Sequence, residues 1–322
     1  MGTFTRRAVF ALASSAFAAC ALSTAVAAYP DRPVRMIIGF PAGGGTDTIG
    51  RLLAQELSKI WGQPVTPENR PGADGAIAAA EVAAGPADGS LIGVITNAHT
   101  ITPAMNRELP YDPVNGFATV AQIATTPNFL LVHPSVPANN VAELIAYAKA
   151  NPDKLTFGSS GTGTSPYLVM ELFKQMAGVK MVHAPYKGGS LAVVGLLSGE
   201  IDLMFVSPAA GYEHVKAGKL KAFAISSPQR WAGAPDIPTV AETGLNGFEG
   251  ATWYGILANK NTPPDIVKKL NADIRKAMSS PAMLQALASQ GFDAVDTTPE
   301  AFREIIATDI AKWKGVIGNI PK

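Results

Sequence analysis

The chain has 322 residues, with 26 basic and 25 acidic side chains, so its formal net charge is +1. This balance argues against a nucleic-acid-binding protein and against an electrostatic membrane-surface protein. A single cysteine, Cys20, excludes an internal disulfide, so stability has to come from a hydrophobic core that a chain of this length can build.

The first 28 residues have the pattern of a secretory signal peptide. Arg6 and Arg7 precede an uncharged apolar stretch over residues 8–26, and small residues ending at Ala28 form a cleavage site. We therefore expect a periplasmic protein cleaved near Ala28, exported by the general or the twin-arginine route. Lipid attachment at Cys20 is a weaker alternative. No later stretch is apolar and long enough to enter a membrane.

A glycine-rich loop follows the first predicted strand. Residues 34–40 form an apolar run, residues 43–45 are three glycines, and apolar residues recur at helical spacing from 49 to 60. Glycines let backbone N–H groups approach a ligand, and a helix N-terminus favours a carboxylate or phosphate. A tight strand-to-helix turn without a ligand is the alternative. The candidate ligand contacts here are Phe40, Gly43, Gly44, Gly45, Thr46 and Asp47.

Two further loops are expected beside the first. A short strand over residues 64–69 leads to a turn at 70–75, and a helix over 76–84 leads to a buried strand over 90–96. This alternation predicts parallel strands, whose carboxyl ends form the usual ligand edge. The candidate contacts in these two loops are Ala73, Asp74, Asn97 and His99.

The middle of the chain repeats the same arrangement. Extended segments over 119–125 and 129–133 suggest a crossing into a second domain, and a helix over 141–150 precedes a strand over 155–159. A second loop, rich in glycine and hydroxyls, then opens a helix in which Pro166 suits the first turn. Its candidate ligand contacts are Ser160, Gly163, Thr164, Ser165 and Tyr167.

The remaining elements complete two domains. Strands are expected over 180–186, 201–206 and 220–226, and a segment rich in Pro and Gly over 228–250 suggests a return crossing. A strand over 252–258 and three helices, opened by Pro263, Pro281 and Pro299, end the chain. We predict an α/β protein of two lobes, each a mainly parallel sheet flanked by helices. Lobe 1 comprises residues 29–126 and 251–322, and lobe 2 comprises residues 127–250.

The chain lacks the motifs of several enzyme classes. It has no phosphate-loop motif, no complete dinucleotide fingerprint, and a glycine–serine segment at 158–161 that is one residue too short for a nucleophile elbow. Its four histidines have no metal-ligand spacing. We therefore expect no catalytic residue, no metal and no cofactor. Two helix N-termini, one from each lobe, suggest instead a hinged cleft that holds an anion.

Several candidate site residues have two possible roles. Asp47 would repel an anion unless it caps the helix or orders a water, or unless the ligand carries an amino group. Asp202 either faces the cleft or braces a neighbouring loop. Tyr167 either covers the ligand or packs at the helix start, and Asp74 is either a ligand contact or a solvated turn residue. His99 is a weaker ligand candidate.

Six segments together resemble the Bug family, the TctC-like substrate-binding proteins of tripartite tricarboxylate transporters. They are YPDRPVR at 29–35, FPAGGGTD at 40–47, ENRPGA at 68–73, GSSGTGT at 158–164, PYKG at 185–188 and IPTVAETG at 237–244. The resemblance covers essentially the whole mature chain. It implies a two-lobed periplasmic binding protein of the Venus-flytrap type, without enzymatic activity, that binds small carboxylates such as dicarboxylates, tricarboxylates, amino acids or aromatic acids.

The resemblance also implies partners and a binding mode. The first glycine loop would hold one ligand carboxylate through backbone N–H groups and waters, and the membrane components of the transporter would receive the ligand. A sensor kinase is an alternative partner, a periplasmic enzyme acting on a carboxylate is a remoter alternative, and a monomer is expected. Asp74 and Tyr167 depart from the residues usual in the family, so the distal end of the ligand cannot be inferred from relatives.

Overall fold

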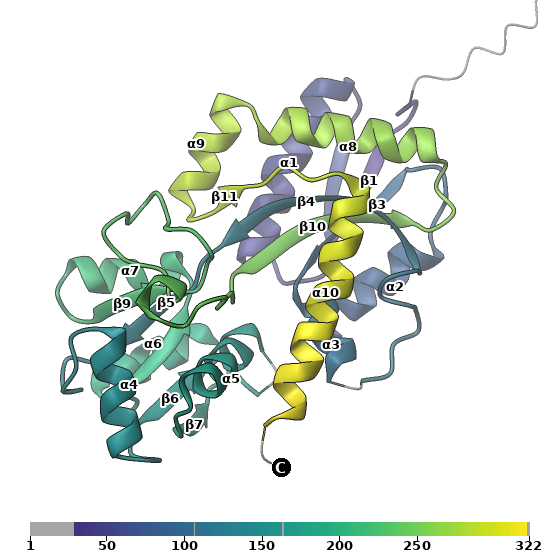
Figure 1. The fold of residues 1–322 in the computed structure, drawn as a ribbon. Helices are drawn as coiled ribbons and strands as arrows, with labels where there is room; N and C mark the ends of the chain where they lie inside the picture. Colours follow the sequence, from purple (N-terminus) through teal and green to yellow (C-terminus); the bar gives the residue numbers. More distant parts are fainter. Residues whose placement is uncertain (1–28, 106, 163, 321–322) are drawn as a thin grey trace, which may run out of the picture.

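A computed structural model describes residues 29–105, 107–162 and 164–320. The predicted signal peptide, residues 1–28, lies outside the described residues. The chain forms two β-sheets, one of six strands and one of five, each flanked by helices (Figure 1). The predicted two-lobed α/β fold is confirmed.

Lobe 1 is the six-stranded sheet and its helices. The strand order is β11-β4-β10-β3-β1-β2. Its first part contains β1 (Val34–Ile38), α1 (Gly45–Trp61), β2 (Val65–Asn69), η1 (Ala73–Gly75), α2 (Ala76–Ala84), β3 (Leu91–Thr96), α3 (Ala98–Ala104) and β4 (Phe117–Thr126). Its second part contains β10 (Thr252–Asn259), α8 (Pro264–Met278), α9 (Pro281–Ser289), β11 (Asp293–Ala294) and α10 (Pro299–Gly318).

Lobe 2 is the five-stranded sheet, with strand order β7-β6-β8-β5-β9. It contains β5 (Phe129–Val132), α4 (Val141–Ala150), β6 (Thr156–Ser159), α5 (Ser165–Ala177), β7 (Val182–Pro185), α6 (Gly189–Ser198), β8 (Leu203–Val206), α7 (Pro208–Lys216) and β9 (Lys221–Ile225). A short 3-10 turn, η2 (Ala241–Thr243), lies in the segment that returns to lobe 1.

Both sheets are mixed, and in each of them most strands run in one direction, as predicted. β2, β1 and β3 run parallel, as do β7, β6 and β8, but β10 is antiparallel to β3 and β4, and β5 is antiparallel to β8 and β9. The cause is the connectivity. β5 and β10 each arrive directly from the other lobe, without a crossover helix, and therefore start at the edge where the neighbouring parallel strands end.

Local signals explain the helix boundaries that matter for the site. Pro166 occupies the first turn of α5, where its missing N–H costs nothing, and Gly178 ends that helix in a left-handed conformation with φ of 64°. α1 likewise ends at Gly62, with φ of 64°. Both helices start directly after the glycine- and hydroxyl-rich loops that the sequence predicts as ligand sites.

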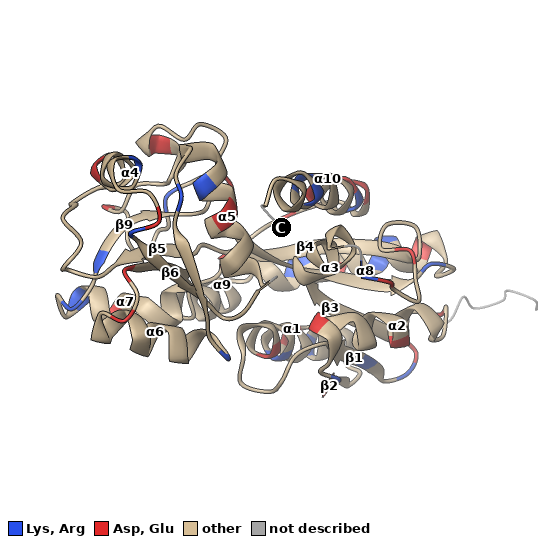
Figure 2. Ribbon diagram, turned by 90° about the horizontal axis from the view of Figure 1, so that it is seen from below, with Lys and Arg blue, Asp and Glu red and all other residues tan. Residues whose placement is uncertain are grey.

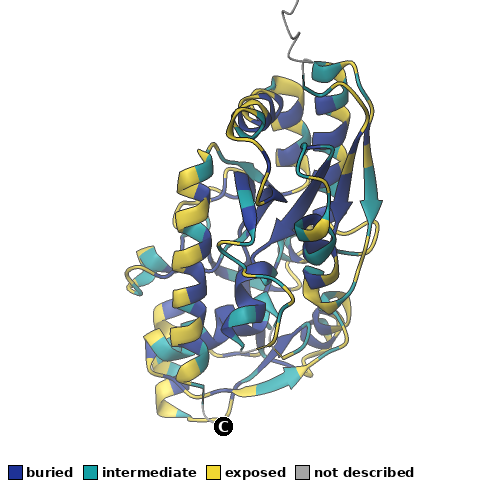
Figure 3. Ribbon diagram, turned by 90° about the vertical axis from the view of Figure 1, so that its right-hand side faces the viewer, coloured by how far each residue is buried: buried dark blue, intermediate teal, exposed yellow. Residues whose placement is uncertain are grey.

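The apolar side chains gather on both faces of each sheet, under the helices. The central strands are buried, the edge strands β2, β7 and β11 are only partly buried, and the outer helix faces are exposed (Figure 3). Lysines, arginines and acidic residues are interspersed over the helices of both lobes (Figure 2). In the described part of the chain, no helix combines the length and apolar content that crossing a bilayer requires.

Two chain crossings lie side by side between the lobes. Asn128, between β4 and β5, receives a hydrogen bond on its backbone oxygen from the N–H of Ser226 and donates its own N–H to Ser226 Oγ, both at 2.9 Å. The Asn128 side chain also donates to the carbonyl of Gly250 at 3.0 Å. The outgoing and returning segments are thus tied to each other, as a hinge requires.

α10 contacts both lobes (Figure 1). Its Phe302 and Ile306 are buried against the lobe 1 sheet, whereas Trp313 and Val316 belong to the apolar cluster of lobe 2. Gln175 of α5 donates to the carbonyl of Val316 at 2.7 Å. The end of the chain therefore packs on lobe 2, because the helix is long enough to pass the boundary between the lobes.

Candidate functional site

A cavity of about 260 Å³ lies between the lobes, at the carboxyl ends of β1, β3 and β6. Residues from both lobes line it, as the closing of a two-lobed protein around a ligand requires. Lobe 1 contributes Phe40, Thr46, Asp74, Thr96, Asn97, Ala98, Ile101, Thr102, Thr252 and Tyr254, and lobe 2 contributes Ser160, Thr164 and Ser165. The three loops predicted to share one edge of lobe 1 thus meet at this cavity.

The first glycine loop forms one wall. A Cβ at Gly39 would lie 2.9 Å from the Cα of Gly75, so the absence of a side chain lets this loop and the turn at 73–75 touch. α1 begins at Gly45, and no side chain of the described residues caps its N-terminus. Thr46, in the first turn, lines the cavity. The uncapped first turn of α1 is therefore directed at the cavity edge.

Asp47 holds this loop rather than lining the cavity. Its carboxylate accepts hydrogen bonds from Gly43 N–H, Arg51 Nε and Asn69 Nδ2, each at 2.9 Å. The Arg51 guanidinium, with the other two donors, lowers the pKa of Asp47 to about 2, against the opposing effect of burial. Asp47 does not cap α1, but its negative charge is compensated inside the loop by these three donors, so it does not oppose an anion in the cavity.

The turn at 73–75 has an unusual backbone. Ala73, Asp74 and Gly75 have φ of 48°, 55° and 90°, so two non-glycine residues in succession are left-handed. Such conformations cost on the order of 1–2 kcal/mol per residue and are often found at ligand sites. Asp74 lines the cavity, and its carboxylate accepts a hydrogen bond from Arg107 Nη1 at 2.7 Å.

The second loop forms the opposite wall. Thr164, the N-cap residue of α5, donates from Oγ1 to the carbonyl of Gly161 at 2.7 Å, and Ser160 Oγ lies 3.2 Å from Thr164 Oγ1. Ser165 Oγ accepts a hydrogen bond from Asn97 Nδ2 of lobe 1 at 3.1 Å. Thr164 does not cap α5 with its side chain, so the first-turn N–H groups of Ser165 and Tyr167, which flank Pro166, are the backbone donors that α5 can offer a ligand.

The donors at this cavity suit an anion. Two helix N-termini, those of α1 and α5, begin at its walls, and eight hydroxyl-bearing residues from both lobes are among its lining. Among the described residues, no lysine, arginine or histidine lines it. A carboxylate here would be bound by backbone N–H groups, hydroxyls and water rather than by an arginine clamp.

Tyr167 lies outside the cavity, although the sequence placed it there. It is two residues beyond Ser165 on α5, about 200° around the helix, and so points into lobe 2. Its ring packs against His183, with centroids 4.6 Å apart, and stacks on Phe157 at 6.3 Å. The alternative of a packed aromatic at the helix start is correct.

Asp202 is also away from the cavity. Its carboxylate accepts the N–H of Thr156 at 2.7 Å, at the first residue of β6. The cavity lies at the other end of that strand, so Asp202 braces the far end of the lobe 2 sheet.

His99 lies behind the cavity wall. Its ring stacks on Tyr111, with centroids 5.7 Å apart, and its Nε2 lies 2.8 Å from the carbonyl of Pro113. Complete burial lowers the pKa of His99 to about 4, so the ring is neutral and donates from Nε2 to that carbonyl. His99 supports the wall from inside lobe 1 and does not line the cavity.

The remaining predicted residues surround the wall. Gly43, Gly44 and Gly45 shape the loop without lining the cavity, and Ala73 lines a neighbouring surface hollow with Ile77 and Arg107. Gly163 lies outside the described residues. Thr252 and Tyr254 line the cavity but were not predicted. β10 follows β3 by about 150 residues, and no local sequence pattern indicates that these two strands pair.

A serine–histidine pair lies near the second loop. Ser159 Oγ is 2.8 Å from His183 Nε2 and also accepts the N–H of Gly161 at 3.1 Å. Ser159 is completely buried and does not line the cavity, so its hydroxyl holds the loop instead of meeting a substrate. Within residues 29–105, 107–162 and 164–320, no three metal-ligating side chains come together.

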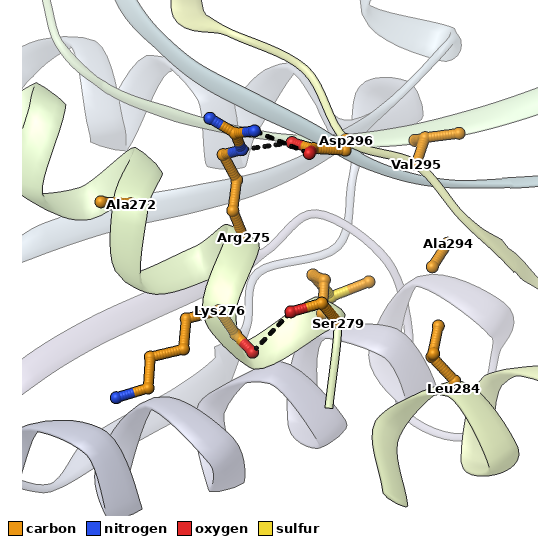
Figure 4. A pocket seen from close by; sticks show the side chains of 9 residues that line it. Ala272, Arg275, Lys276, Ser279, Leu284, Ala294, Val295 and Asp296 are labelled. Atoms are coloured by element: carbon orange, nitrogen blue, oxygen red, sulfur yellow. Dashed lines mark hydrogen bonds and ion pairs between the residues drawn. The ribbon is translucent and has the colours of Figure 1, made fainter. Parts of the chain in front are cut away.

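A larger hollow, of about 450 Å³, lies elsewhere on lobe 1, between α8, α9 and β11 (Figure 4). Arg275 is paired there with Asp296, and Lys276 points away from that pair. The hollow is built from lobe 1 alone, so movement of the lobes cannot close it. The smaller cavity between the lobes is therefore the better candidate site.

Residues 49–321 match the family described as Tripartite tricarboxylate transporter family receptor. The chain belongs to this family. It is 35% identical to Protein BugT of Bordetella pertussis over 291 residues, which cover 90% of this chain and 89% of that protein. The Bug/TctC resemblance predicted from the six segments is thereby confirmed. The family and the fold are those of solute-binding receptors.

Two solved structures that this chain resembles contain a carboxylate. Rpa4515 of R. palustris with adipate is 34% identical, with a TM-score of 0.75 and coverage of 89% of this chain and 97% of that chain. MatC from Rhodopseudomonas palustris with bound malate is 30% identical, with a TM-score of 0.74 and coverage of 90% and 100%. Adipate and malate, the acids in these two structures, are both small dicarboxylates.

Proposed function

We propose that this chain is a periplasmic receptor that captures a small carboxylate between its lobes and delivers it to the membrane components of a tripartite tricarboxylate transporter. The family supports the receptor role and the kind of transporter. A leader over residues 1–28 supports export. The receptors with bound adipate and malate support a small acid as the ligand.

One observation carries the proposal. The N-termini of α1 and α5, one from each lobe, begin at the walls of the same cavity, with Thr46 and Thr164 beside them. Each N-terminus offers unpaired N–H groups and about half a positive charge. An anionic group between them would be stabilised by both lobes and would favour the closed arrangement.

The cavity volume limits the ligand. About 260 Å³ is at the low end of small-molecule sites. We propose residues 29–126 with 251–320 and residues 127–250 as the two bodies that move, with the tied segments at Asn128 and Gly250 as the hinge. The membrane partner would then distinguish the closed, loaded receptor from the open, empty one.

Thermal unfolding with a panel of small acids tests this function. A ligand at a hundred times its Kd should stabilise the protein by about 2.7 kcal/mol. Thr46→Trp and Thr164→Trp should abolish that shift by filling the cavity, whereas Thr66→Trp, at an exposed position on the edge strand β2, should keep it. No shift with any acid, or a full shift in both cavity variants, would contradict the proposal. Recovery of each acid unchanged, by NMR, separates a receptor from an enzyme.

A further inference from the structure

The cavity wall carries a single charge. Among the described residues that line it, Asp74 is the only one with a charged side chain, and the others are apolar, hydroxyl, amide or tyrosyl. The donors of α1 and α5 account for one carboxylate of a ligand. Asp74 is an acceptor, so it must face a different part of that ligand.

The fold holds Asp74 in place at an energetic cost. Its left-handed backbone, with φ of 55° and ψ of 34°, continues that of Ala73, in the turn whose next residue, Gly75, touches the first glycine loop at Gly39. Asn and Asp are the residues besides glycine that visit this region most readily, so the conformation itself is compatible with either side chain. The strain is held in the turn that closes one side of the cavity.

Arg107 holds the carboxylate of Asp74 in place but leaves some of its acceptor positions available. Arg107 Nη1 donates to Oδ2 of Asp74 at 2.7 Å, and Asp74 remains 51% exposed. A carboxylate has two oxygens and about four acceptor positions, so the pair leaves room for a further donor. Arg107 itself lines the neighbouring hollow with Ile77 and Leu109, and not the cavity. It is therefore a positioning residue.

The arrangement discriminates between ligands of equal size. A second ligand carboxylate beside Asp74 would meet a like charge, which is unfavourable. An ammonium or hydroxyl at the same place would donate to Asp74. We infer that Asp74 is a specificity-determining residue, and that this receptor prefers small carboxylates whose other end carries a hydrogen-bond donor over plain dicarboxylates. The inference rests on the proposed function, and it refines the ligand class.

Calorimetric titration with matched acids tests it. The pairs are succinate with 4-aminobutyrate and glutarate with 5-aminopentanoate, and 4-hydroxybutyrate serves as the hydroxyl counterpart of succinate. Wild-type protein should bind at least one donor-bearing acid about tenfold or more tighter than its plain counterpart. Preference for 4-aminobutyrate or 5-aminopentanoate would identify an ammonium, and preference for 4-hydroxybutyrate alone would identify a hydroxyl.

Three variants separate charge from structure. Asp74→Asn should reduce that preference about tenfold, with the affinity for the plain diacid unchanged or higher. Arg107→Gln should weaken the plain diacid further, because it leaves the charge of Asp74 uncompensated. Asp153→Asn is the matched control. Asp153 is also left-handed, with φ of 59°, but it lies on lobe 2 outside the cavity, and this variant should keep wild-type selectivity.

The outcomes distinguish the two proposals. Plain diacids binding as tightly as their counterparts, or an Asp74→Asn variant with unchanged selectivity, would overturn the role of Asp74 and leave the receptor function standing. Binding of none of these acids, nor of any acid in the thermal panel, would overturn the receptor function and, with it, this inference.

Discussion

Asn97 of lobe 1 donates from Nδ2 to Oγ of Ser165 in lobe 2, at 3.1 Å. Both residues line the cavity, and Ser165 is the first residue of α5. The bond forms only when the lobes are as close as they are here, so it couples the approach of the lobes to the shape of the ligand cavity.

Loss of this bond should favour the open arrangement. Asn97→Ala removes about 0.5–1.5 kcal/mol from the closed form, which corresponds to roughly fivefold weaker ligand binding. Small-angle scattering of the loaded protein should show a larger radius of gyration at equal ligand concentration. Asn261→Ala, in the exposed loop after β10, is the control. Unchanged affinity and radius in Asn97→Ala would refute the coupling.

Asp47 should stabilise the conformation of the first glycine loop. Asp47→Asn removes the charge that Arg51 pairs with and weakens the acceptor for Gly43 N–H, so we expect a loss of about 1–3 kcal/mol in the free energy of unfolding and weaker ligand binding. Urea unfolding and calorimetry measure the two effects. Asp31→Asn, an exposed surface substitution, should change neither. A fully stable Asp47→Asn variant with normal affinity would show that the loop is held by other contacts.

Burial of the neutral His99 ring should make the free energy of unfolding depend on pH. Its pKa in the folded protein is about 4, below the unfolded value of 6.5, so protons bind preferentially to the unfolded chain. The stability that the neutral ring allows is fully present above pH 6.5 and is lost as the pH falls toward 4. By pH 5 the loss in the free energy of unfolding is about 2 kcal/mol. In urea unfolding between pH 7 and pH 5, His99→Gln should lack this component. His214→Gln, on the surface helix α7, is the matched control. An identical pH slope in His99→Gln and wild-type protein would exclude this role.

Trp313 should contribute to the stability of both lobes, because α10 packs on each. Its side chain is 1% exposed in the lobe 2 cluster, whereas Phe302 of the same helix is buried against lobe 1. Trp313→Ala should lower the free energy of unfolding by about 3–5 kcal/mol in urea titrations, and Lys314→Ala, at the next and exposed position, by less than about 0.5 kcal/mol. Equal effects in the two variants would mean that the helix end is only loosely attached.

The sequence carried enough information for the fold class and for the loops of the site. Glycines and hydroxyls between an apolar run and a helical period identified the loops that bring Phe40, Thr46, Ser160, Thr164 and Ser165 to the cavity. Strand direction was less accessible, because antiparallel pairing of β5 and β10 follows from the crossings between lobes and not from local pattern.

Side-chain direction limited the prediction of individual residues. Tyr167 is two positions from Ser165, yet the helix turns it into lobe 2, and His99 is two positions from Asn97, yet it points behind the wall. Asp202 comes three residues after Gly199 but lies at the far end of its sheet. Tyr254 reaches the cavity through its pairing with Thr96, which depends on the complete sheet.

The location of a bound acid tests the central claim most directly. A crystal structure of the mature protein with the acid that gives the largest thermal shift should show density between the lobes, with one carboxylate at the N-termini of α1 and α5, within hydrogen-bonding distance of Thr46 or Thr164. Density in the hollow beside Arg275 and Asp296, with an empty cavity between the lobes, would contradict it.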